Sequence, residues 1–136
     1  MQPLQKSHLQ VNTDLNALPK VLTWFDQFNC PPINYQTWLK CQLALAEGFT
    51  NAVRHAHRGK PSTLSIELEV AMFPERMEIR IWDWGAPFDL EKAIHRMPGK
   101  EAEGGRGIPL MCRIADVLSY TRIDNKRNCL LIIKQY

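Results

Sequence analysis

The sequence predicts an α+β fold, a two-layer sandwich in which helices pack on one face of a mainly antiparallel mixed sheet. Two helical segments precede a segment of alternating apolar and polar residues, and a third helical segment precedes another pair of strands. The turns inside each pair of strands are short, which favours antiparallel pairing. With 136 residues, the chain has the length of one domain with one core, so we expect a single domain over residues 1–136.

The first half of the chain predicts a short strand and two helices. "HLQVNT", residues 8–13, fits a strand. Apolar residues at helical spacing then predict a helix over residues 15–28. Two consecutive prolines interrupt it, and Asn34 can cap a second helix over residues 35–57.

The second half predicts two hairpins with a glycine-rich loop and a helix between them. Leucine, isoleucine and valine alternate with serine and glutamate in "TLSIELEVAMF", as in a strand with one buried face. "IPLMCRIADVL" is apolar enough to be a helix packed on the sheet. The expected segments are strands 63–73 and 77–84, loop 85–107, helix 108–118, and strands 118–123 and 129–136.

The composition excludes several classes of protein. Hydrophobic residues make up 45% and charged residues 23%, as in globular proteins. The net charge of +3 comes without a concentrated basic block, so we expect no direct binding of nucleic acid. No apolar run approaches the roughly 20 residues that span a bilayer, so we expect no membrane contact. The four cysteines are scattered, which favours free thiols and a cytoplasmic location.

A polar stripe crosses the otherwise apolar second helix. Glu47, Asn51 and His55 are spaced by four residues and therefore share one side. They could be a solvated edge of the helix. Alternatively, the Asn51 oxygen could hold Mg²⁺ and Glu47 could accept a proton. His55 and His57 lie about 200° apart around a helix and cannot chelate one ion; we expect His55 to be partly buried and His57 to be partly positive at the helix C-terminus.

Two further segments could bind a nucleotide. Asp83 ends an apolar strand in "IWDWGAPFD", where it is either a turn residue or an acceptor for an exocyclic amine such as that of adenine. Gly85 would let the base approach the backbone. In "EGGRGIPLM", glycines lead directly into a helix, which is either a loop with a helix start or a phosphate site. The candidate residues of this segment are Gly104, Gly105, Arg106 and Gly107.

Three motifs in this order resemble one superfamily. They are E-x-x-x-N-A-x-x-H-A, D-x-G-x-x-F-D and G-G-x-G-I before an apolar helix. Together they resemble the histidine-kinase-like ATPase superfamily with its Bergerat ATP-binding fold. Within it, "EGFTNAVRHA" and "DWGAPFD" are most similar to the anti-sigma-factor serine-protein kinases of bacteria.

The resemblance implies a role for each motif. Asn51 would be the Mg²⁺ ligand and Glu47 the general base for phosphoryl transfer. Asp83 would bind the adenine amino group of ATP, with Gly85 beside it. The glycines of the third motif would wrap the phosphates.

Two departures from the family pattern affect this expectation. Glu103 and Gly104 stand where the family often carries an arginine, and Arg106 lies inside the motif instead. Asn128 and Cys129 replace a Gly-Thr pair whose threonine helps to bind nucleotide. We therefore expect that contact to be lost or replaced, with weaker binding of ATP or little turnover as the consequence.

The resemblance implies a serine/threonine protein kinase in a partner-switching module of transcription regulation. Its substrate would be a serine on a STAS-type anti-sigma-factor antagonist, and it would also sequester a sigma factor or another regulator. The main alternative is a nucleotide-sensing binding module with little or no turnover. A detached histidine-kinase domain and a structural domain with coincidental motifs rank below both. A homodimer would use helix 15–28 and exposed apolar residues near Trp24 or Trp38.

Overall fold

A single five-stranded sheet is the base of the protein. The computed structural model describes residues 2–87, 89–90 and 107–136. In these residues the strand order is β1-β2-β3-β5-β4, and each neighbouring pair is antiparallel. The strands are β1 (Gln5–Asn12), β2 (Ser65–Met72), β3 (Arg76–Asp83), β4 (Val117–Arg122) and β5 (Asn128–Gln135).

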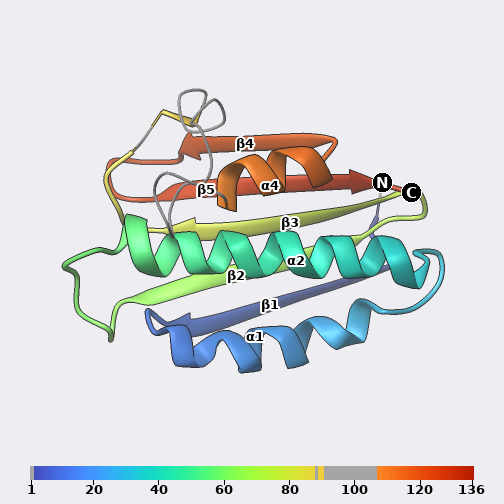
Figure 1. Ribbon diagram of the computed structural model, residues 1–136, viewed down its shortest axis with the longest axis horizontal. Helices are drawn as coiled ribbons and strands as arrows, with labels where there is room; N and C mark the ends of the chain where they lie inside the picture. The colour runs from blue at the N-terminus through green and yellow to red at the C-terminus, as the bar shows by residue number, and fades with distance from the viewer. Residues whose placement is uncertain (1, 88, 91–106) are drawn as a thin grey trace.

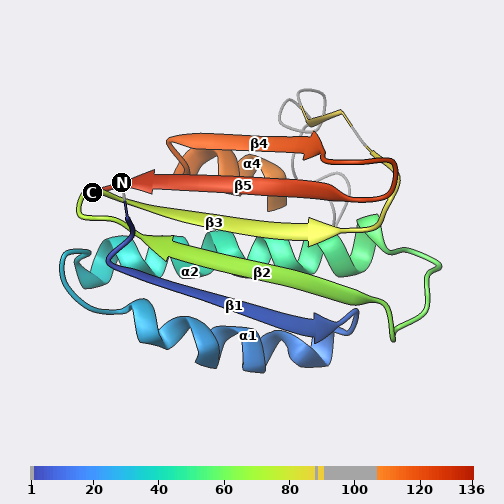
Figure 2. The ribbon, with the colours of Figure 1, turned by 180° about the vertical axis from the view of Figure 1, so that it is seen from behind.

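The described helices all cover the same face of this sheet, and the opposite face carries none of them (Figures 1 and 2). α1 lies along the β1 edge, α4 lies over the β4–β5 edge, and α2 runs between them (Figure 1). The α+β sandwich expected from the sequence is therefore confirmed. The helices are α1 (Leu18–Phe25), α2 (Tyr35–Asn51) and α4 (Gly107–Ile114), and 3-10 turns at Leu15–Ala17 and Asp26–Phe28 flank α1.

The long helix α2 begins where the sequence predicts it. The Asn34 side chain accepts a hydrogen bond from the Thr37 amide at 2.8 Å, as an N-cap does. Apolar residues at helical spacing, among them Trp38, Leu45 and Phe49, are buried against the sheet. After Asn51 the helix widens into a π-helical turn over Ala52–Ala56. The sequence predicts a regular helix to residue 57 and does not predict this π-helical turn.

Alternation in the central strands places apolar residues under the helices. In β2 the inward Ile66, Leu68 and Val70 are fully buried. Their neighbours Glu67 and Glu69 point to the open face, where each has a basic partner. Lys6 Nζ on the neighbouring strand β1 lies 3.8 Å from Glu69 Oε2, and Arg127 Nη1 in the turn between β4 and β5 lies 3.2 Å from Glu67 Oε2.

Among the element boundaries that differ from the prediction, two have a clear physical reason. β1 begins at Gln5 rather than residue 8, because its first inward side chains are polar and find partners on α1; Trp24 Nε1, for example, donates to Ser7 Oγ at 2.9 Å. α4 ends at Ile114 rather than residue 118 because pairing with β5 takes over, with the Asp116 amide donating to the Ile133 carbonyl at 2.8 Å. Within the described residues, every helix is too short or too polar to cross a membrane.

Candidate functional site

Four elements end or begin at one end of the sheet. α2 ends there, β3 ends there, and β5 and α4 begin there (Figure 1). This arrangement places Glu47 and Asn51 on the last turns of α2, Asp83 at the final position of β3 and Gly107 at the first position of α4. The structure therefore brings residues from all three sequence motifs to the same end of the molecule.

Glu47 lies directly against the start of α4. A Cβ built on Gly107 would lie 3.0 Å from Glu47 Oε2, so a side chain there would crowd the carboxylate. The next residue, Gly48, allows α2 to pack closely on the sheet, since its Cβ would lie 2.6 Å from Ile81 Cδ1. Sequence reasoning did not identify Gly48. A glycine inside an otherwise good helix was the available signal.

The polar stripe of α2 contains side chains whose hydrogen-bonding groups are not used by any described residue. Glu47 and Asn51 are half-buried, and their side chains make no hydrogen bond or ion pair with any described residue. Because they are half-buried, the interpretation of the stripe as a solvated helix edge is weakened. His55 does not share their environment: it is exposed, with Nδ1 3.5 Å from Arg58 Nη2, so its expected partial burial is wrong.

Asp83 is the opposite case, because its buried carboxylate is held from several sides. Only 3% of the residue is exposed. Its Oδ1 accepts from the Gly85 amide at 2.8 Å and from Asn128 Nδ2 at 2.9 Å. The Tyr120 hydroxyl donates to Oδ2 at 2.9 Å and to Oδ1 at 3.1 Å. A carboxylate held in this way is fixed in position and remains an acceptor.

Tyr120 is a site residue that the sequence did not identify, and Asn128 is one that the sequence marked only as a departure from the family pattern. They come from β4 and β5, and the pairing of these strands carries both side chains to the helical face beside Asp83. Burial, together with the Asp83 carboxylate, raises the pKa of the Tyr120 hydroxyl, which therefore stays a donor. Asn128 is fully buried and also donates to the Gly85 carbonyl at 2.8 Å. The Asn128 side chain, from the pair that stands in place of the Gly-Thr pattern, thus holds the Asp83 turn.

Gly85 is needed because another part of the backbone packs against it. A Cβ at this position would overlap the carbonyl group of Ala56, at the end of the π-helical turn. The sequence predicts a glycine that admits a nucleotide base, and the structure gives it an additional neighbour within the protein. The turn after β3 is therefore tied to the end of the second helical segment.

His57 makes the same connection through its side chain. It is 2% exposed, Nε2 lies 2.8 Å from the Trp84 amide nitrogen, and Nδ1 lies 2.7 Å from Thr13 Oγ1. Burial lowers the pKa of its imidazole. The expectation of a partly positive His57 is therefore wrong, because the side chain turns into the protein instead of remaining in solvent at the helix terminus.

The predicted phosphate loop is only partly covered by the structure. Gly104, Gly105 and Arg106 lie outside the described residues, and Gly107 opens α4. Among the described residues, no three His, Cys, Asp or Glu side chains form a group that could hold a metal ion. Mg²⁺ in a phosphate site commonly takes only one or two protein ligands. The Asn51 amide, which has no partner among the described residues, is a ligand that fits this ion.

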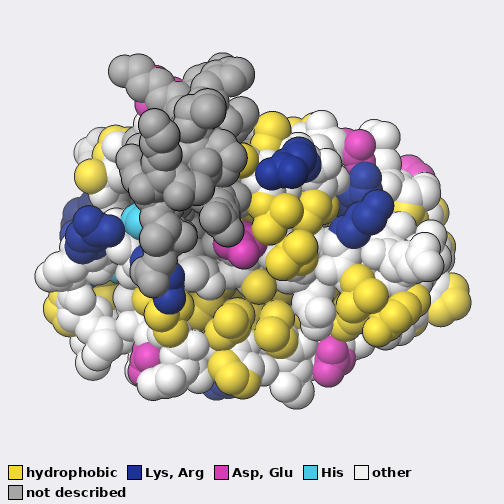
Figure 3. Space-filling view, in the orientation of Figure 1, with side chains coloured by type: hydrophobic (Ala, Val, Ile, Leu, Met, Phe, Trp, Pro, Cys, Tyr) yellow, Lys and Arg dark blue, Asp and Glu magenta, His cyan; other side chains and the backbone are white. Residues whose placement is uncertain are grey.

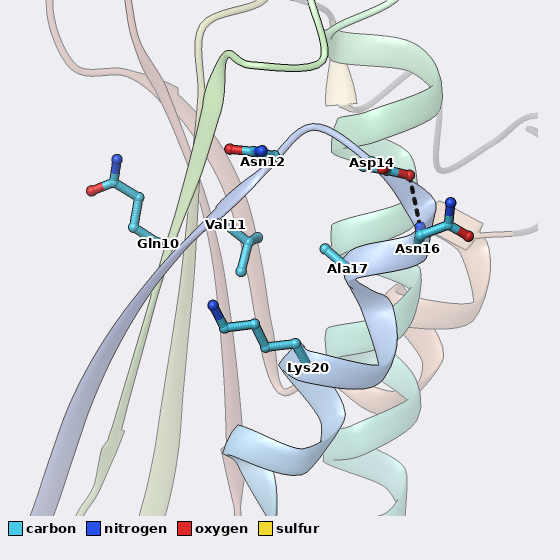
Figure 4. Close-up of a pocket in the computed structure, with 7 residues that line it drawn as sticks. All are labelled: Gln10, Val11, Asn12, Asp14, Asn16, Ala17 and Lys20. Carbon is cyan, nitrogen blue, oxygen red and sulfur yellow. Dashed lines mark hydrogen bonds between the residues drawn. The ribbon is translucent and has the colours of Figure 1, made fainter.

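A separate hollow of about 340 Å³ lies between the end of β1 and the start of α1 (Figure 4). Its most prominent polar contact is internal, since the Asp14 carboxylate accepts from the Asn16 amide at 2.9 Å. The hollow contains none of the residues of the three motifs. Its lining consists of Gln10, Val11, Asn12, Asp14, Asn16, Ala17 and Lys20.

Apolar side chains also lie exposed on the helical face (Figure 3). Three of them, Tyr35, Leu39 and Leu43, follow one side of α2 at intervals of four residues and are 59%, 38% and 43% exposed. We call them the α2 apolar stripe. Trp38, which the sequence associates with a possible interface, is itself buried beneath this region and stacks on Phe25 with ring centroids 5.4 Å apart.

Comparison with known proteins gives consistent matches. Residues 11–134 match the family of histidine kinase-like ATPase domains. The chain is 28% identical over 92 residues to the serine-protein kinase RsbW of Bacillus licheniformis, covering 62% of this chain and 56% of that protein. It is 30% identical over 91 residues to the protein of that name from Listeria monocytogenes, covering 61% of this chain and 57% of that protein. It is also 30% identical over 112 residues to the serine-protein kinase RsbW of Oceanobacillus iheyensis, covering 76% of this chain and 68% of that protein. The chain spans a little over half the length of the first two relatives.

Proposed function

Because the chain belongs to the family of histidine kinase-like ATPase domains and is related within it to anti-sigma-factor serine-protein kinases, we propose that it is a Mg-ATP-dependent serine/threonine protein kinase. The membership confirms the resemblance that the three sequence motifs indicate. The kinase activity, its substrates and its partners are the proposal.

One observation carries this proposal. The Glu47 carboxylate, which has no partner among the described residues, lies against Gly107 at the start of α4. A helix N-terminus preceded by glycines suits phosphate groups, because its free amides and its dipole favour negative charge. A carboxylate without a partner at that place is positioned for proton transfer to or from a group that reacts with a phosphate.

In the proposed reaction Glu47 acts as the general base. The hydroxyl oxygen of a serine on the partner attacks the γ-phosphorus of ATP, and its proton passes to Glu47. The bond between the γ-phosphorus and the bridging oxygen breaks, and ADP leaves with that oxygen. Asp83 accepts a hydrogen bond from the adenine amino group at the other end of the nucleotide.

Asn51 would hold Mg²⁺, which neutralises charge on the phosphates when it is bound. The phosphates would be wrapped by the loop of Gly104, Gly105 and Arg106, which leads into Gly107 and α4. Phosphoryl transfer depends mainly on positioning and on neutralisation of charge. The chain therefore contains each kind of residue that the proposed reaction needs: a general base, a metal ligand and a loop for the phosphates.

We propose a partner-switching role in the cytoplasm for the whole protein. Its phosphorylated substrate would be a serine of a STAS-type anti-sigma-factor antagonist, and the captured regulator would be a sigma factor or a protein of similar role. The relatives named RsbW are called serine-protein kinases, which supports the first half of this proposal. A homodimer that uses residues near Trp38 would be compatible with the exposed α2 apolar stripe.

The test is phosphoryl transfer from γ-labelled ATP to STAS-type antagonist proteins, measured for the wild type and for Glu47→Gln. We expect transfer to fall by about a hundred- to ten-thousandfold in the variant, which is the range for loss of a general base. Binding of ATP, measured by calorimetry with Mg²⁺, should stay within about threefold of the wild type because the base does not hold the nucleotide. Equal transfer by both proteins would refute the assignment of Glu47.

The alternative, a nucleotide-sensing binding module, is favoured by one observation. The α2 apolar stripe exposes three large side chains that a partner protein could cover. In that case, wild-type protein would bind ATP and a regulator but transfer no phosphate to any antagonist tested. Leu39→Asp would then weaken capture of the regulator while leaving the affinity for ATP unchanged.

A further inference from the structure

His57 ties four elements together at the end of the sheet where Asp83 lies. The residue follows the π-helical turn after α2 and is 2% exposed. Its Nε2 is 2.8 Å from the amide nitrogen of Trp84, which directly follows β3. Its Nδ1 is 2.7 Å from Thr13 Oγ1, just after β1. Thr13 Oγ1 in turn lies 2.6 Å from the Leu64 carbonyl oxygen, just before β2.

These contacts determine where the imidazole carries its proton. The Leu64 carbonyl can only accept, so the single hydroxyl proton of Thr13 goes to it. The Thr13 oxygen must then accept from His57, which requires a proton on Nδ1. The Trp84 amide can only donate, so Nε2 must carry a lone pair. His57 is therefore neutral and protonated on Nδ1.

The accepting nitrogen holds the turn that positions Asp83. Trp84 lies between Asp83 and Gly85, and the Gly85 amide donates to Asp83 Oδ1 at 2.8 Å. Gly85 also packs so closely on the Ala56 carbonyl that no side chain fits between them. The His57–Trp84 hydrogen bond therefore fixes the same turn from the end of the second helical segment, in addition to the hydrogen bonds that Asn128 and Tyr120 make to Asp83 from β5 and β4.

A second proton on His57 would be incompatible with this arrangement. An N–H at Nε2 would face the Trp84 N–H, leaving two buried donors opposed. The charged groups that act on the ring are Asp83 from β3, which favours the imidazolium, and Lys60 from the segment after the helix, which disfavours it. The neighbours from β1 and β2, Thr13 and the Leu64 carbonyl, are neutral. Burial has the largest effect and lowers the pKa of His57.

The geometry points to His57 as a positioning residue for nucleotide binding: its neutral, Nδ1-protonated form holds the Asp83–Gly85 turn in place for adenine, and a second proton releases that turn. This inference rests on the proposed function, because it takes Asp83 to be the adenine-binding residue. It adds a proton-sensitive support to the site from a residue that lies outside the three motifs.

Two substitutions separate the two halves of the His57 interaction. In His57→Gln the side-chain oxygen can reach the place of Nε2, so it can accept from Trp84, but the residue no longer titrates. In His57→Asn the shorter amide can donate to Thr13 from the place of Nδ1 but cannot reach Trp84. Thermal unfolding of both variants identifies any loss of folding before binding is compared.

The experiment measures the Kd for Mg-ATP between pH 8 and pH 5.5 for the wild type and both variants. Protonation of ATP affects all three proteins equally, so the ratio of wild-type Kd to Gln-variant Kd is the decisive quantity. We expect this ratio to be constant above pH 6.5 and to rise below it, by roughly tenfold or more once the ring is charged. The Asn variant should bind roughly tenfold more weakly than the wild type at pH 8. A ratio that does not change with pH would overturn the inference.

A second measurement needs neither ATP nor a variant. Long-range ¹H–¹⁵N NMR spectra of the wild type report which nitrogen of His57 carries the proton, and the Trp84 amide signal should move together with the His57 titration. A proton on Nε2 at neutral pH would overturn the inference. If the wild type bound no ATP at any pH while these NMR signatures were present, the proposed function would fail and the support of the turn by His57 would stand.

Discussion

Two carboxylates at the same end of the sheet have opposite surroundings. Asp83 belongs to what we call the Asp83 cluster, with Gly85, Tyr120 and Asn128, where it receives hydrogen bonds on both oxygens. Glu47 belongs to the α2 polar stripe with Asn51, where neither side chain has a partner in the described part of the chain. Asp83 is therefore fixed in position before any ligand binds, whereas the Glu47 carboxylate is not held by any described residue.

This difference separates the two tasks of a nucleotide-dependent enzyme. An acceptor for a planar base must be held still, because a misplaced acceptor loses a directional hydrogen bond. A general base must instead be available for a proton and must not be neutralised by a structural partner. In a folded protein the first kind of group contributes to stability and the second does not, which makes the comparison measurable.

The largest effect is expected from removing each carboxylate in turn. Asp83→Ala leaves the Tyr120 hydroxyl and the Gly85 amide without their acceptor, and we expect it to lower the free energy of unfolding by about 3 kcal/mol. Glu47→Ala removes no hydrogen bond to a described residue and should change it by less than about 0.5 kcal/mol. Urea unfolding at pH 7.5 measures both. Equal costs for the two variants would show that the comparison is mistaken.

A smaller effect is expected within the Asp83 cluster. Tyr120→Phe removes one hydroxyl that donates to Asp83 and leaves the donors from Asn128 and Gly85 in place. We expect a loss of about 1 kcal/mol in the free energy of unfolding. Tyr35→Phe is the matched control, because the same hydroxyl is removed from a tyrosine that is 59% exposed. If the control cost as much as Tyr120→Phe, the buried hydrogen bond would not be the cause.

The smallest effect is expected in the pH dependence of stability. Burial lowers the pKa of His57 below its unfolded value of 6.5, so the folded state favours the neutral ring. Its contribution is complete above about pH 6.5 and declines as the pH falls below that value, toward the folded pKa, because the unfolded state then binds more protons. The free energy of unfolding should therefore fall less between pH 7 and pH 5.5 in His57→Gln than in the wild type. Identical pH profiles would contradict this prediction.

Much of the architecture could be predicted because it depends on local patterns. Alternation in β2 and β3, the helical spacing in α2 and the Asn34 cap each act over a few residues, and each is present where expected. The first three residues of β1 were missed because the inward residues Gln5 and Ser7 are polar. Their burial depends on partners in the helical layer that no local pattern reveals.

The site divides in the same way. Glu47, Asn51, Asp83 and Gly107 stand in motifs whose spacing already groups them, and the fold places them at one end of the sheet. Tyr120 was missed, and Asn128 was marked only as a departure from the family pattern, because each is an isolated polar residue in a strand. Only the pairing of β3 with β5, and of β5 with β4, gives them the same neighbour.

The sequence by itself determined the class of fold, the order of the elements and the motif residues, since periodicity and motif spacing are properties of neighbouring residues. The tertiary structure alone decided that Asp83 is held by three groups, that Gly85 meets Ala56, and that His57 is neutral. These features depend on contacts between segments far apart in the chain. The physical reason is that a proton or a lone pair is assigned by the partner a group meets, and the fold chooses that partner.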